Sequence, residues 1–224
     1  MPSGRKSRAN RRVASVPTNR ARRASPKALA AGAILVVAAA VAIVLGVVLS
    51  GGKSSAPPVT VVGSLRNGLP GAAEVDSMFK GIPQHGMTLG RASAPVTLIE
   101  YVDLQCPYCK QMEVGTLPDL LTRYVRSGKA KIVARPLAFS SDSARGRSAM
   151  IAAGLQNRAF NFAQVLYLNQ GTENTGWLND GMIAQAAASI PGLRVTDLLA
   201  ARKAVGVSKV ATQIDSIANT GRIH

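Results

Sequence analysis

Glu100-Tyr-Val-Asp-Leu-Gln-Cys-Pro-Tyr-Cys-Lys110 is the stretch that decides the fold of this 224-residue chain. It holds the only two cysteines, Cys106 and Cys109, between a run of strand-forming residues and a helical pattern. Pro107 suits the first turn of a helix, because its φ is fixed near the helical value and it has no N–H to leave unpaired. We therefore expect Cys106 at the helix N-terminus and Cys109 one turn further in, with both sulfurs on one face and close enough to bond.

This placement favours redox chemistry at the two cysteines. The unpaired N–H groups and the positive end of the helix dipole stabilise a thiolate at Cys106, and a thiolate is the species that attacks disulfides. Cys109 would then resolve the mixed disulfide. Two alternatives remain. The cysteine pair could be half of a zinc site, but a closed zinc site needs four ligands, and only His85 and His224 are available besides the cysteines. A structural disulfide that closes so short a loop would add little stability.

The segment Val96-Thr-Leu-Ile-Glu-Tyr-Val-Asp-Leu-Gln-Cys-Pro-Tyr-Cys109 resembles the first core strand and active site of DsbA-like thiol:disulfide oxidoreductases of the membrane-anchored bacterial type. The resemblance runs from about Gly81 to the C-terminus. It also includes the segments Leu117-Pro118, Arg135-Pro136-Leu137-Ala138-Phe139 and Asn169-Gln170-Gly171. It implies an α/β, thioredoxin-like fold with an α-helical insertion at about residues 141–220, which covers one side of the active site.

The resemblance also implies roles for individual residues. Cys106 would be the attacking catalytic cysteine and Cys109 the resolving one. Pro107 and Tyr108 would tune the reduction potential, and Glu100 would be the acidic strand residue beneath the active site that tunes its proton transfers. For Glu100, an ordinary outward-facing strand carboxylate is the alternative.

Three other side chains could belong to the site, but we favour other roles for them. Trp177 and Tyr167 could line a substrate groove of the helical insertion, but packing in the core is the interpretation that we favour. We expect His85 in an exposed loop, within the turn-rich segment Gly81–Gly90, rather than as a ligand or a base.

The pattern of residues around the cysteines predicts the core elements. Val96–Val102 is rich in β-formers and mostly apolar, which is typical of a central strand covered on both faces. The next helix is expected from Pro107 to Arg126, with a kink at Pro118. Ala130–Arg135 predicts the next strand, and the order strand, helix, strand implies a parallel crossover. From Ser143 onward, apolar residues at spacings of three and four predict further helices.

One expected feature is missing from the sequence. In the thioredoxin fold, the last insertion helix leads into a strand preceded by a cis-proline, which faces the two cysteines. The chain stops at Gly221-Arg-Ile-His224, where that segment would begin, and neither Pro136 nor Pro191 has such a context. We therefore expect truncated C-terminal strands, a central strand with an unpaired and aggregation-prone edge, and a chain that is a fragment or the product of a premature stop.

The N-terminal part carries much of the formal charge of +16. Residues 1–27 hold nine basic residues and no acidic one, and predict a disordered cytoplasmic tail that contacts anionic lipids. Residues 28–49 are an apolar run of 22, long enough for a transmembrane helix. A cleaved signal peptide is the alternative, but its apolar region is typically about 7–15 residues long. Basic residues stay on the cytoplasmic side, so everything after Ser50 is expected to be extracytoplasmic, where disulfides persist.

The predicted organisation is therefore a tail at 1–27, a transmembrane helix at 28–49, a linker with short elements at 50–80 and a DsbA-like thioredoxin domain at 81–224. Within the linker segment, a short strand at 59–62 and a short helix at Ala72–Phe79 are expected.

Together these features predict a single-pass cell-membrane enzyme that forms or rearranges disulfides in exported proteins. Its partners would be reduced or misoxidised exported proteins, the lipid bilayer and, by family analogy, a quinone-linked thiol oxidase of the DsbB or vitamin K epoxide reductase type. No nucleic acid, metal or organic cofactor is expected. The alternatives are a disulfide isomerase or reductase, a truncated non-catalytic peptide-binding module, and a metal chaperone that uses both thiolates.

Overall fold

The computed structural model describes residues 60–221, all within one compact unit that spans Pro57–His224. The predicted tail and the predicted transmembrane helix at 28–49 lie outside the described residues. Within the described range, no helix combines the length and the apolar character that crossing a membrane requires. In chain order the elements are α2 (Ala72–Phe79), β1 (Gln84–His85), β2 (Thr88–Leu89), β3 (Val96–Val102), α3 (Pro107–Gly115), α4 (Leu117–Leu120), the π-helical turn η1 (Leu121–Val125), β4 (Ala130–Pro136), α5 (Ser141–Gly154), α6 (Ala159–Leu168), α7 (Asp180–Ala188), α8 (Val195–Ala201) and α9 (Val205–Thr220).

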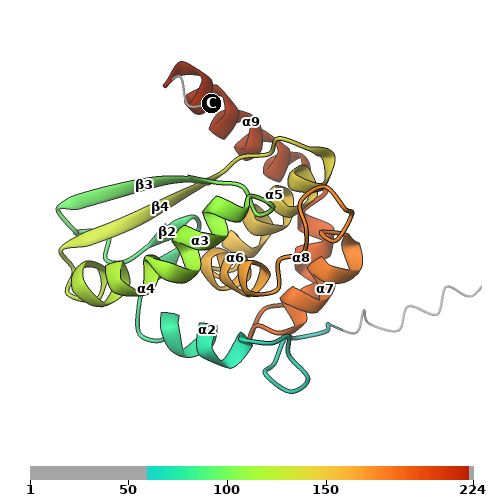
Figure 1. The fold of residues 1–224 in the computed structure, drawn as a ribbon, viewed down its shortest axis with the longest axis horizontal. Coiled ribbons are helices and arrows are strands. Elements are labelled where there is room, and N and C mark those ends of the chain that lie inside the picture. The colour runs from blue at the N-terminus through green and yellow to red at the C-terminus, as the bar shows by residue number, and fades with distance from the viewer. Residues whose placement is uncertain (1–59, 222–224) are drawn as a thin grey trace, which may run out of the picture. The chain divides into compact units, whose positions relative to one another are not determined.

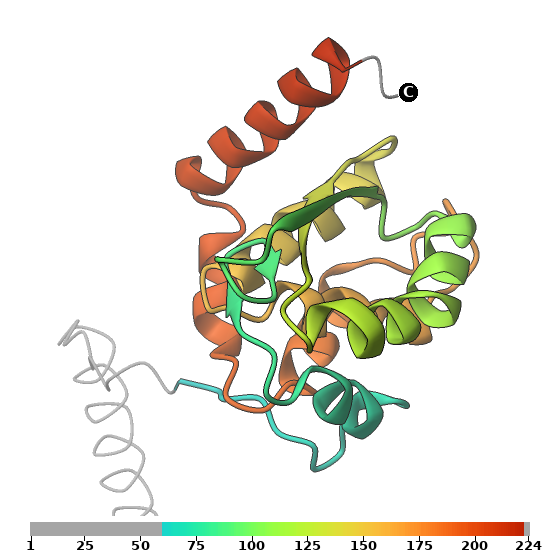
Figure 2. The same ribbon diagram turned by 90° about the vertical axis from the view of Figure 1, so that its left-hand side faces the viewer.

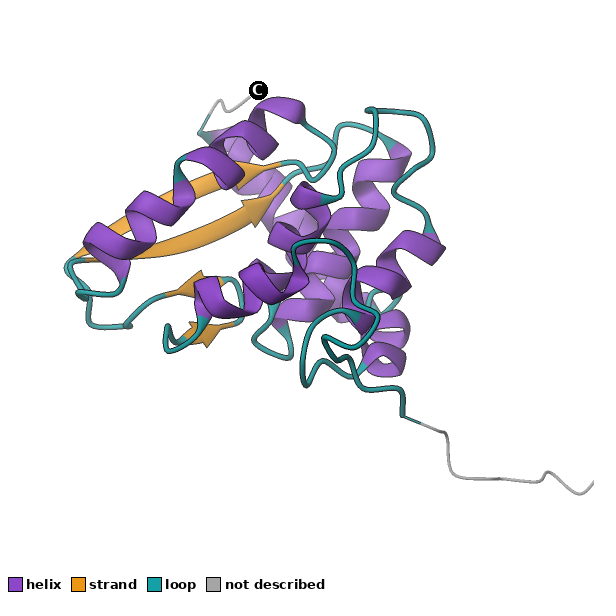
Figure 3. Ribbon diagram, turned by 60° about the horizontal axis from the view of Figure 1, so that its bottom comes forward, coloured by secondary structure: helices purple, strands orange, loops and turns teal. Residues whose placement is uncertain are grey.

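The sheet is built around the parallel pair of β3 and β4. Its strand order is β1-β2-β4-β3, and β3 and β4 pair in register from Val96↔Ala130 to Val102↔Pro136. α3, α4 and η1 connect the two strands, so the predicted parallel crossover is confirmed. On its other side β4 pairs antiparallel with β2, and Figure 3 shows the short hairpin beside the two long strands.

This hairpin of β1 and β2 was not predicted, because each strand has only two residues and shows no alternating pattern. Gly86 stands in the two-residue loop between the strands with a φ of +58°, a conformation that glycine adopts without strain. His85 is exposed as expected, but it lies in β1 rather than in a loop. We also expected a short strand at 59–62. Residues 60–62, which the structure describes, form no strand, and Val62 makes only an isolated bridge with Arg194.

β3 lies at the edge of the described sheet. The strand has the predicted bounds, but the prediction that both of its faces are covered was wrong. Val96, Leu98 and Ile99 are 58%, 38% and 44% exposed, and no strand of the described residues pairs with the second edge of β3. The unpaired edge that we expected is therefore present, and it carries apolar side chains.

The helix after the cysteines is interrupted rather than kinked. We expected one helix from Pro107 to Arg126 with a kink at Pro118, but α3 ends at Gly115 and α4 begins at Leu117. Pro118 has no N–H to donate to the fourth residue before it, and its ring crowds the carbonyl group of that residue. The interruption therefore lies before the proline, and the chain continues through the π-helical turn η1.

The helices from α5 to α9 confirm the helical region predicted after β4. α6 is buried along nearly its whole length, from Ala159 to Tyr167. The phenyl rings of Phe160 on α6 and Phe79 on α2 lie 6.3 Å apart, so α2, which has the predicted bounds, joins the same core. Figure 1 shows β3 and β4 on one side of the fold and α7 and α8 on the other, and in Figure 2 α9, drawn in red, projects from the other helices.

The exposed apolar edge of β3 leads to a prediction about self-association. Ile99→Lys places a charge on the free strand, which opposes pairing with another edge. We expect the variant to associate less than the unchanged chain as concentration rises, measured by sedimentation or light scattering. Leu155→Lys is the control, because Leu155 is 67% exposed and lies beyond the end of α5. Equal association of all three proteins would contradict the role of the edge.

Candidate active site

Asp103 shapes the turn between β3 and α3. One carboxylate oxygen accepts the N–H of Gln105 at 2.8 Å, and the other accepts the N–H of Phe139 at 3.3 Å. The carbonyl oxygen of Asp103 accepts the N–H of Cys106 at 3.1 Å. Asp103 is buried, so these bonds are made away from water, and they hold the start of α3 against the end of β3.

The cysteines occupy the predicted positions on the helix. Cys106 is the N-cap residue of α3 with an extended backbone, and Pro107 follows at the first helical position. The side chain of Cys106 makes no capping hydrogen bond, so its sulfur stays available. Tyr108 is 79% exposed. Both cysteines are half-buried free thiols, which is the reduced form of the pair.

Cys109 packs against the hydrophobic core. Burial raises the pKa of its thiol to about 12, and the neighbouring Cys106 and the charge of Asp103 act in the same direction against a hydrogen bond from the Asp103 backbone. Cys109 is therefore a protonated thiol at neutral pH. It has to lose a proton before it can attack a disulfide, and it has to gain one to be a good leaving group.

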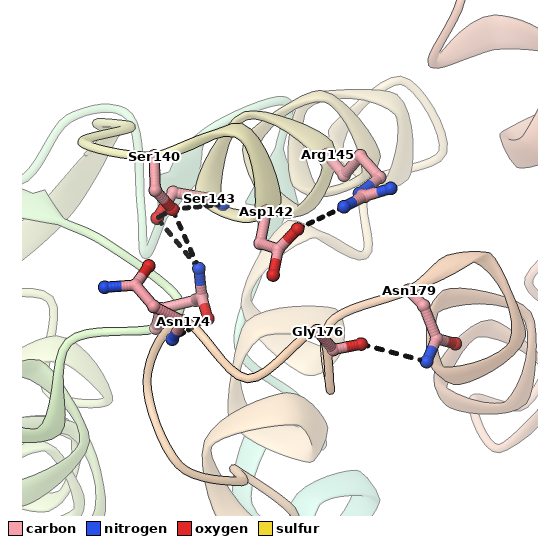
Figure 4. Close-up of polar contacts among 8 residues, drawn as sticks. Ser140, Asp142, Ser143, Arg145, Asn174, Gly176 and Asn179 are labelled. Atoms are coloured by element: carbon pink, nitrogen blue, oxygen red, sulfur yellow. Dashed lines mark hydrogen bonds and ion pairs between the residues drawn. The ribbon is translucent and has the colours of Figure 1, made fainter.

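Two glutamines, to which the sequence analysis assigned no role, hold the segment before the cysteines by hydrogen bonds. The side chain of Gln105 donates to Ser140 Oγ at 3.0 Å and to Ser143 Oγ at 3.3 Å, and its Oε1 accepts the N–H of Asn174 at 3.1 Å. Figure 4 shows Ser140 and Ser143 at the start of α5, beside the segment that carries Asn174. Gln170 donates to the carbonyl oxygens of Leu104 at 2.9 Å and Cys106 at 3.2 Å. The loop between α6 and α7 thus holds the carbonyl side of the active-site turn.

Two buried carboxyl groups lie in the interior next to the cysteine pair. Glu100 on β3 is 7% exposed, which excludes the alternative of an outward-facing carboxylate, and burial raises its pKa to about 7. Glu113 on α3 is 3% exposed, and burial together with the charge of Glu100 raises its pKa well above the usual range. Glu113 was missed, although an acidic residue four positions after Cys109 shares its helix face and could have been found by that spacing.

Tyr167 on α6 is fully buried, which confirms the packing interpretation. Its hydroxyl group donates to the carbonyl oxygen of Asp103 at 3.2 Å. Burial raises its pKa well above the usual range, and Glu113, Cys109, Glu100 and Asp103 all act in the same direction. The phenol therefore lies among the acidic groups of the site. Trp177 is half-buried and packs against the core.

A hollow of about 380 Å³ lies between the free edge of β3 and α3. Its walls are Leu98, Ile99, Glu100, Tyr101, Val102, Tyr108, Cys109 and Met112. Cys109 and Glu100 therefore face the same hollow. Among the described residues, no group of three or more His, Cys, Asp or Glu side chains is arranged to hold a metal ion.

Burial of Glu100 predicts that stability falls as pH rises. Below pH 4.5 the carboxyl is protonated in both the folded and the unfolded chain, whereas up to about pH 7 the unfolded chain ionises first. Above pH 7 the raised pKa of Glu100 therefore lowers the free energy of unfolding by about 3 kcal/mol, at 1.36 kcal/mol for each pKa unit. Urea unfolding at both ends of this range measures the loss. Glu100→Gln should remove this part of the pH dependence, and an unchanged dependence in the variant would contradict the assignment.

The bonds of Gln170 predict a local loss of order. Gln170→Ala removes the donor of the buried Leu104 carbonyl oxygen, which costs about 1–3 kcal/mol, whereas the Cys106 carbonyl oxygen keeps the N–H of Lys110. We expect faster amide hydrogen exchange in the turn around Cys106 and a lower melting temperature. Gln111→Ala is the matched control, because Gln111 is exposed on α3. Equal exchange in the two variants would show that Gln170 does not hold the turn.

The thioredoxin family profile matches residues 83–217. Among curated proteins, the chain is similar to the probable disulfide bond formation protein D of Bacillus cereus, with 29% identity over 99 residues. The match covers 43% of this chain and 46% of that relative, which is less than two thirds of the relative's length.

Among solved structures, the fold is similar to that of oxidised BdbD from Bacillus subtilis, with a TM-score of 0.58, 19% identity and coverage of 64% of this chain and 81% of that one. It is also similar to MdbA, a thiol-disulfide oxidoreductase from Corynebacterium matruchotii, with a TM-score of 0.54, 17% identity and coverage of 66% and 83%. These similarities confirm the predicted DsbA-like, thioredoxin-like fold with a helical region.

Proposed function

Because the chain belongs to the thioredoxin family, we propose that it is a DsbA-like thiol:disulfide oxidoreductase that forms disulfide bonds in exported proteins. One observation carries the proposal: Cys106 is the N-cap residue of α3 and has a free thiol, and Cys109 lies one turn further in and lines the same hollow as Glu100. The similarity to a probable disulfide bond formation protein supports the direction of the reaction.

In the proposed reaction, the oxidised Cys106–Cys109 pair is the oxidant. A substrate thiolate attacks the sulfur of Cys106, the bond between the two cysteines breaks, and its electron pair leaves on Cys109, which takes up a proton. A second substrate thiolate then attacks the substrate sulfur of the mixed disulfide and releases Cys106 as a thiolate. The substrate loses two electrons and gains a disulfide, and the cysteine pair becomes a dithiol.

The sequence supports an extracytoplasmic site for this reaction. The apolar run at 28–49 follows a strongly basic segment, so we propose a single membrane anchor with the catalytic domain outside. Disulfides persist there and are rare in a reducing cytosol. A membrane quinone-linked thiol oxidase would then return the pair to its oxidised form.

The proposal predicts that both cysteines are required. Cys106→Ala removes the sulfur that substrate attacks, and Cys109→Ala leaves the pair unable to form its own disulfide. We expect each variant to lose all measurable oxidation of a reduced, unfolded substrate protein, followed by the loss of free thiols. Full activity in either variant would refute the mechanism.

The same assay separates an oxidase from its rivals. A chain that rearranges a scrambled substrate but does not oxidise a reduced one is an isomerase. A chain that binds the unfolded substrate without changing its thiol count is a peptide-binding module. An oxidase is also reduced by glutathione far more readily than a reductase is, so a redox titration gives an independent result.

A further inference from the structure

A polar cavity of about 410 Å³ lies beside the first two turns of α5. Its other walls come from the start of α7 and from the turn that follows α8. The polar side chains that line it are Ser141, Arg145, Ser148, Asp180, Arg202 and Lys203. Figure 4 shows Arg145 on α5 and, at the start of α7, Asn179, the residue that precedes Asp180. Three cationic side chains from distant parts of the sequence therefore meet in one cavity.

The positive charges of this cavity exceed the carboxylates that pair with them. Arg202 is 8% exposed and its Nη2 pairs with Asp180 Oδ2 at 2.6 Å, while Arg145 pairs with Asp142. Lys203 forms no ion pair with a carboxylate of residues 60–221. The hydrogen bond from Arg202 lowers the pKa of Asp180, and the charge of Lys203 acts in the same direction, as does that of Arg145. All three cations therefore lie near one carboxylate, and their charge is only partly balanced.

Two further features of the cavity favour a negatively charged ligand. The buried Nε of Arg202 has no hydrogen-bond partner in the part of the chain that the structure describes. A guanidinium group has five N–H donors, and the one ion pair with Asp180 does not satisfy them all. Ser141 is the first residue of α5, where backbone N–H groups without partners in the helix carry the positive end of its dipole. Both features add to the attraction for an anion.

The charge balance indicates which anion fits. Within residues 60–221, three cations of the cavity meet two carboxylates in ion pairs, so a single negative charge would neutralise the excess. A carboxylate carries one charge, whereas a phosphate dianion carries two. Arginine and lysine side chains bind carboxylates through short hydrogen bonds in which both partners are charged. The cavity is therefore suited to one additional carboxylate.

This cavity lies close to the active-site turn. Ser140, the residue before Ser141, accepts a hydrogen bond from the side chain of Gln105 at 3.0 Å, and Gln105 immediately precedes Cys106. An extended peptide advances about 3.3 Å for each residue. A substrate segment that is bonded to Cys106 therefore needs only a few residues to reach the cavity.

We propose that the cavity is a substrate subsite, which binds the carboxylate of an Asp or Glu side chain a few residues away from the substrate cysteine. The inference rests on the proposed function, because the substrate is held there while its cysteine reacts at Cys106. Lys203 is the specificity-determining residue, since its charge is not engaged by a carboxylate of the described chain. The subsite lies away from the reacting sulfurs, so it selects among substrates and leaves the chemistry of the cysteine pair unchanged.

The test measures how fast the oxidised full chain oxidises short reduced peptides. Each peptide contains a pair of cysteines and a single Glu at a varied spacing from them, and a matched peptide has Gln at the same place. Rate constants are divided by the fraction of peptide thiol that is ionised. At one spacing, we expect the Glu peptide to react roughly 3- to 10-fold faster than its Gln match, because it gains hydrogen bonds between charged groups.

Lys203→Gln should abolish the preference for Glu at that spacing and leave the rate of the Gln peptide unchanged. Lys209→Gln is the matched control, because it removes the same charge at an exposed position on α9 that does not line the cavity. The control should keep the preference for Glu. Both lysines are exposed, so we expect both variants to fold.

Two results would overturn the inference and leave the proposed function intact. A preference for Glu that is equal at every spacing and persists in Lys203→Gln would show only long-range attraction to a basic protein. Equal rates for the Glu and Gln peptides at all spacings would show that the cavity takes no carboxylate of the substrate. A failure of the unchanged chain to oxidise any of the peptides is a different result, which would refute the proposed function itself.

Inorganic phosphate, added at constant ionic strength, distinguishes a substrate subsite from a site for a free anion. It should compete for the cavity, and so slow the oxidation of the preferred Glu peptide without slowing that of its Gln match. Phosphate could instead shift the amide NMR signals of Ser141 and Lys203 while the Glu and Gln peptides react equally. That outcome would assign the cavity to a free anion and overturn the role in substrate selection.

Discussion

The buried carboxylate of Asp103 is the constraint on which the rest of the site depends. Its two oxygens bind the N–H groups of Gln105 and Phe139, and its carbonyl oxygen accepts from Cys106 and from Tyr167. One residue thus connects the end of β3, the start of α3, the segment after β4 and α6. An ionised carboxylate is expensive to bury unless its hydrogen bonds persist. The position of the cysteine pair is therefore tied to the core of the protein and not to the helix alone.

Burial of Glu100 and Glu113 lowers the stability of the folded chain near this turn. Each stands where an apolar side chain would pack without a desolvation cost, and each destabilises the folded chain more as pH rises. Glu100 shares a hollow with Cys109, and Glu113 follows Cys109 on the same helix. Local rules of stability are commonly broken where chemistry is carried out. The two carboxyls fit that pattern, because they lie next to the thiol whose proton has to move.

The strongest local signals in the sequence predicted the frame of the site. Pro107 beside Cys106 fixed the start of α3, and two runs of β-formers gave β3 and β4, because these features depend on a few neighbouring residues. The hairpin escaped prediction since its strands are two residues long and are stabilised by pairing with β4. Gln105 and Gln170 received no role, because their partners lie on distant segments that only the fold brings together, and Glu113 was missed although it shares a helix face with Cys109.

The two cysteines are three positions apart, yet their surroundings differ, and this difference orders the proposed reaction. Cys106 stands at the first turn of α3, where helix N–H groups stabilise negative charge and no capping bond engages the sulfur. Cys109 lies beside an interior that contains Glu100 and Glu113, and no Lys or Arg side chain of residues 60–221 forms an ion pair with either carboxyl group. A thiolate is therefore opposed at Cys109, whose pKa is raised by burial. Attack at Cys106 sends the electron pair to the sulfur that holds a proton most strongly, so protonation of Cys109 favours the reduced pair and makes its disulfide oxidising.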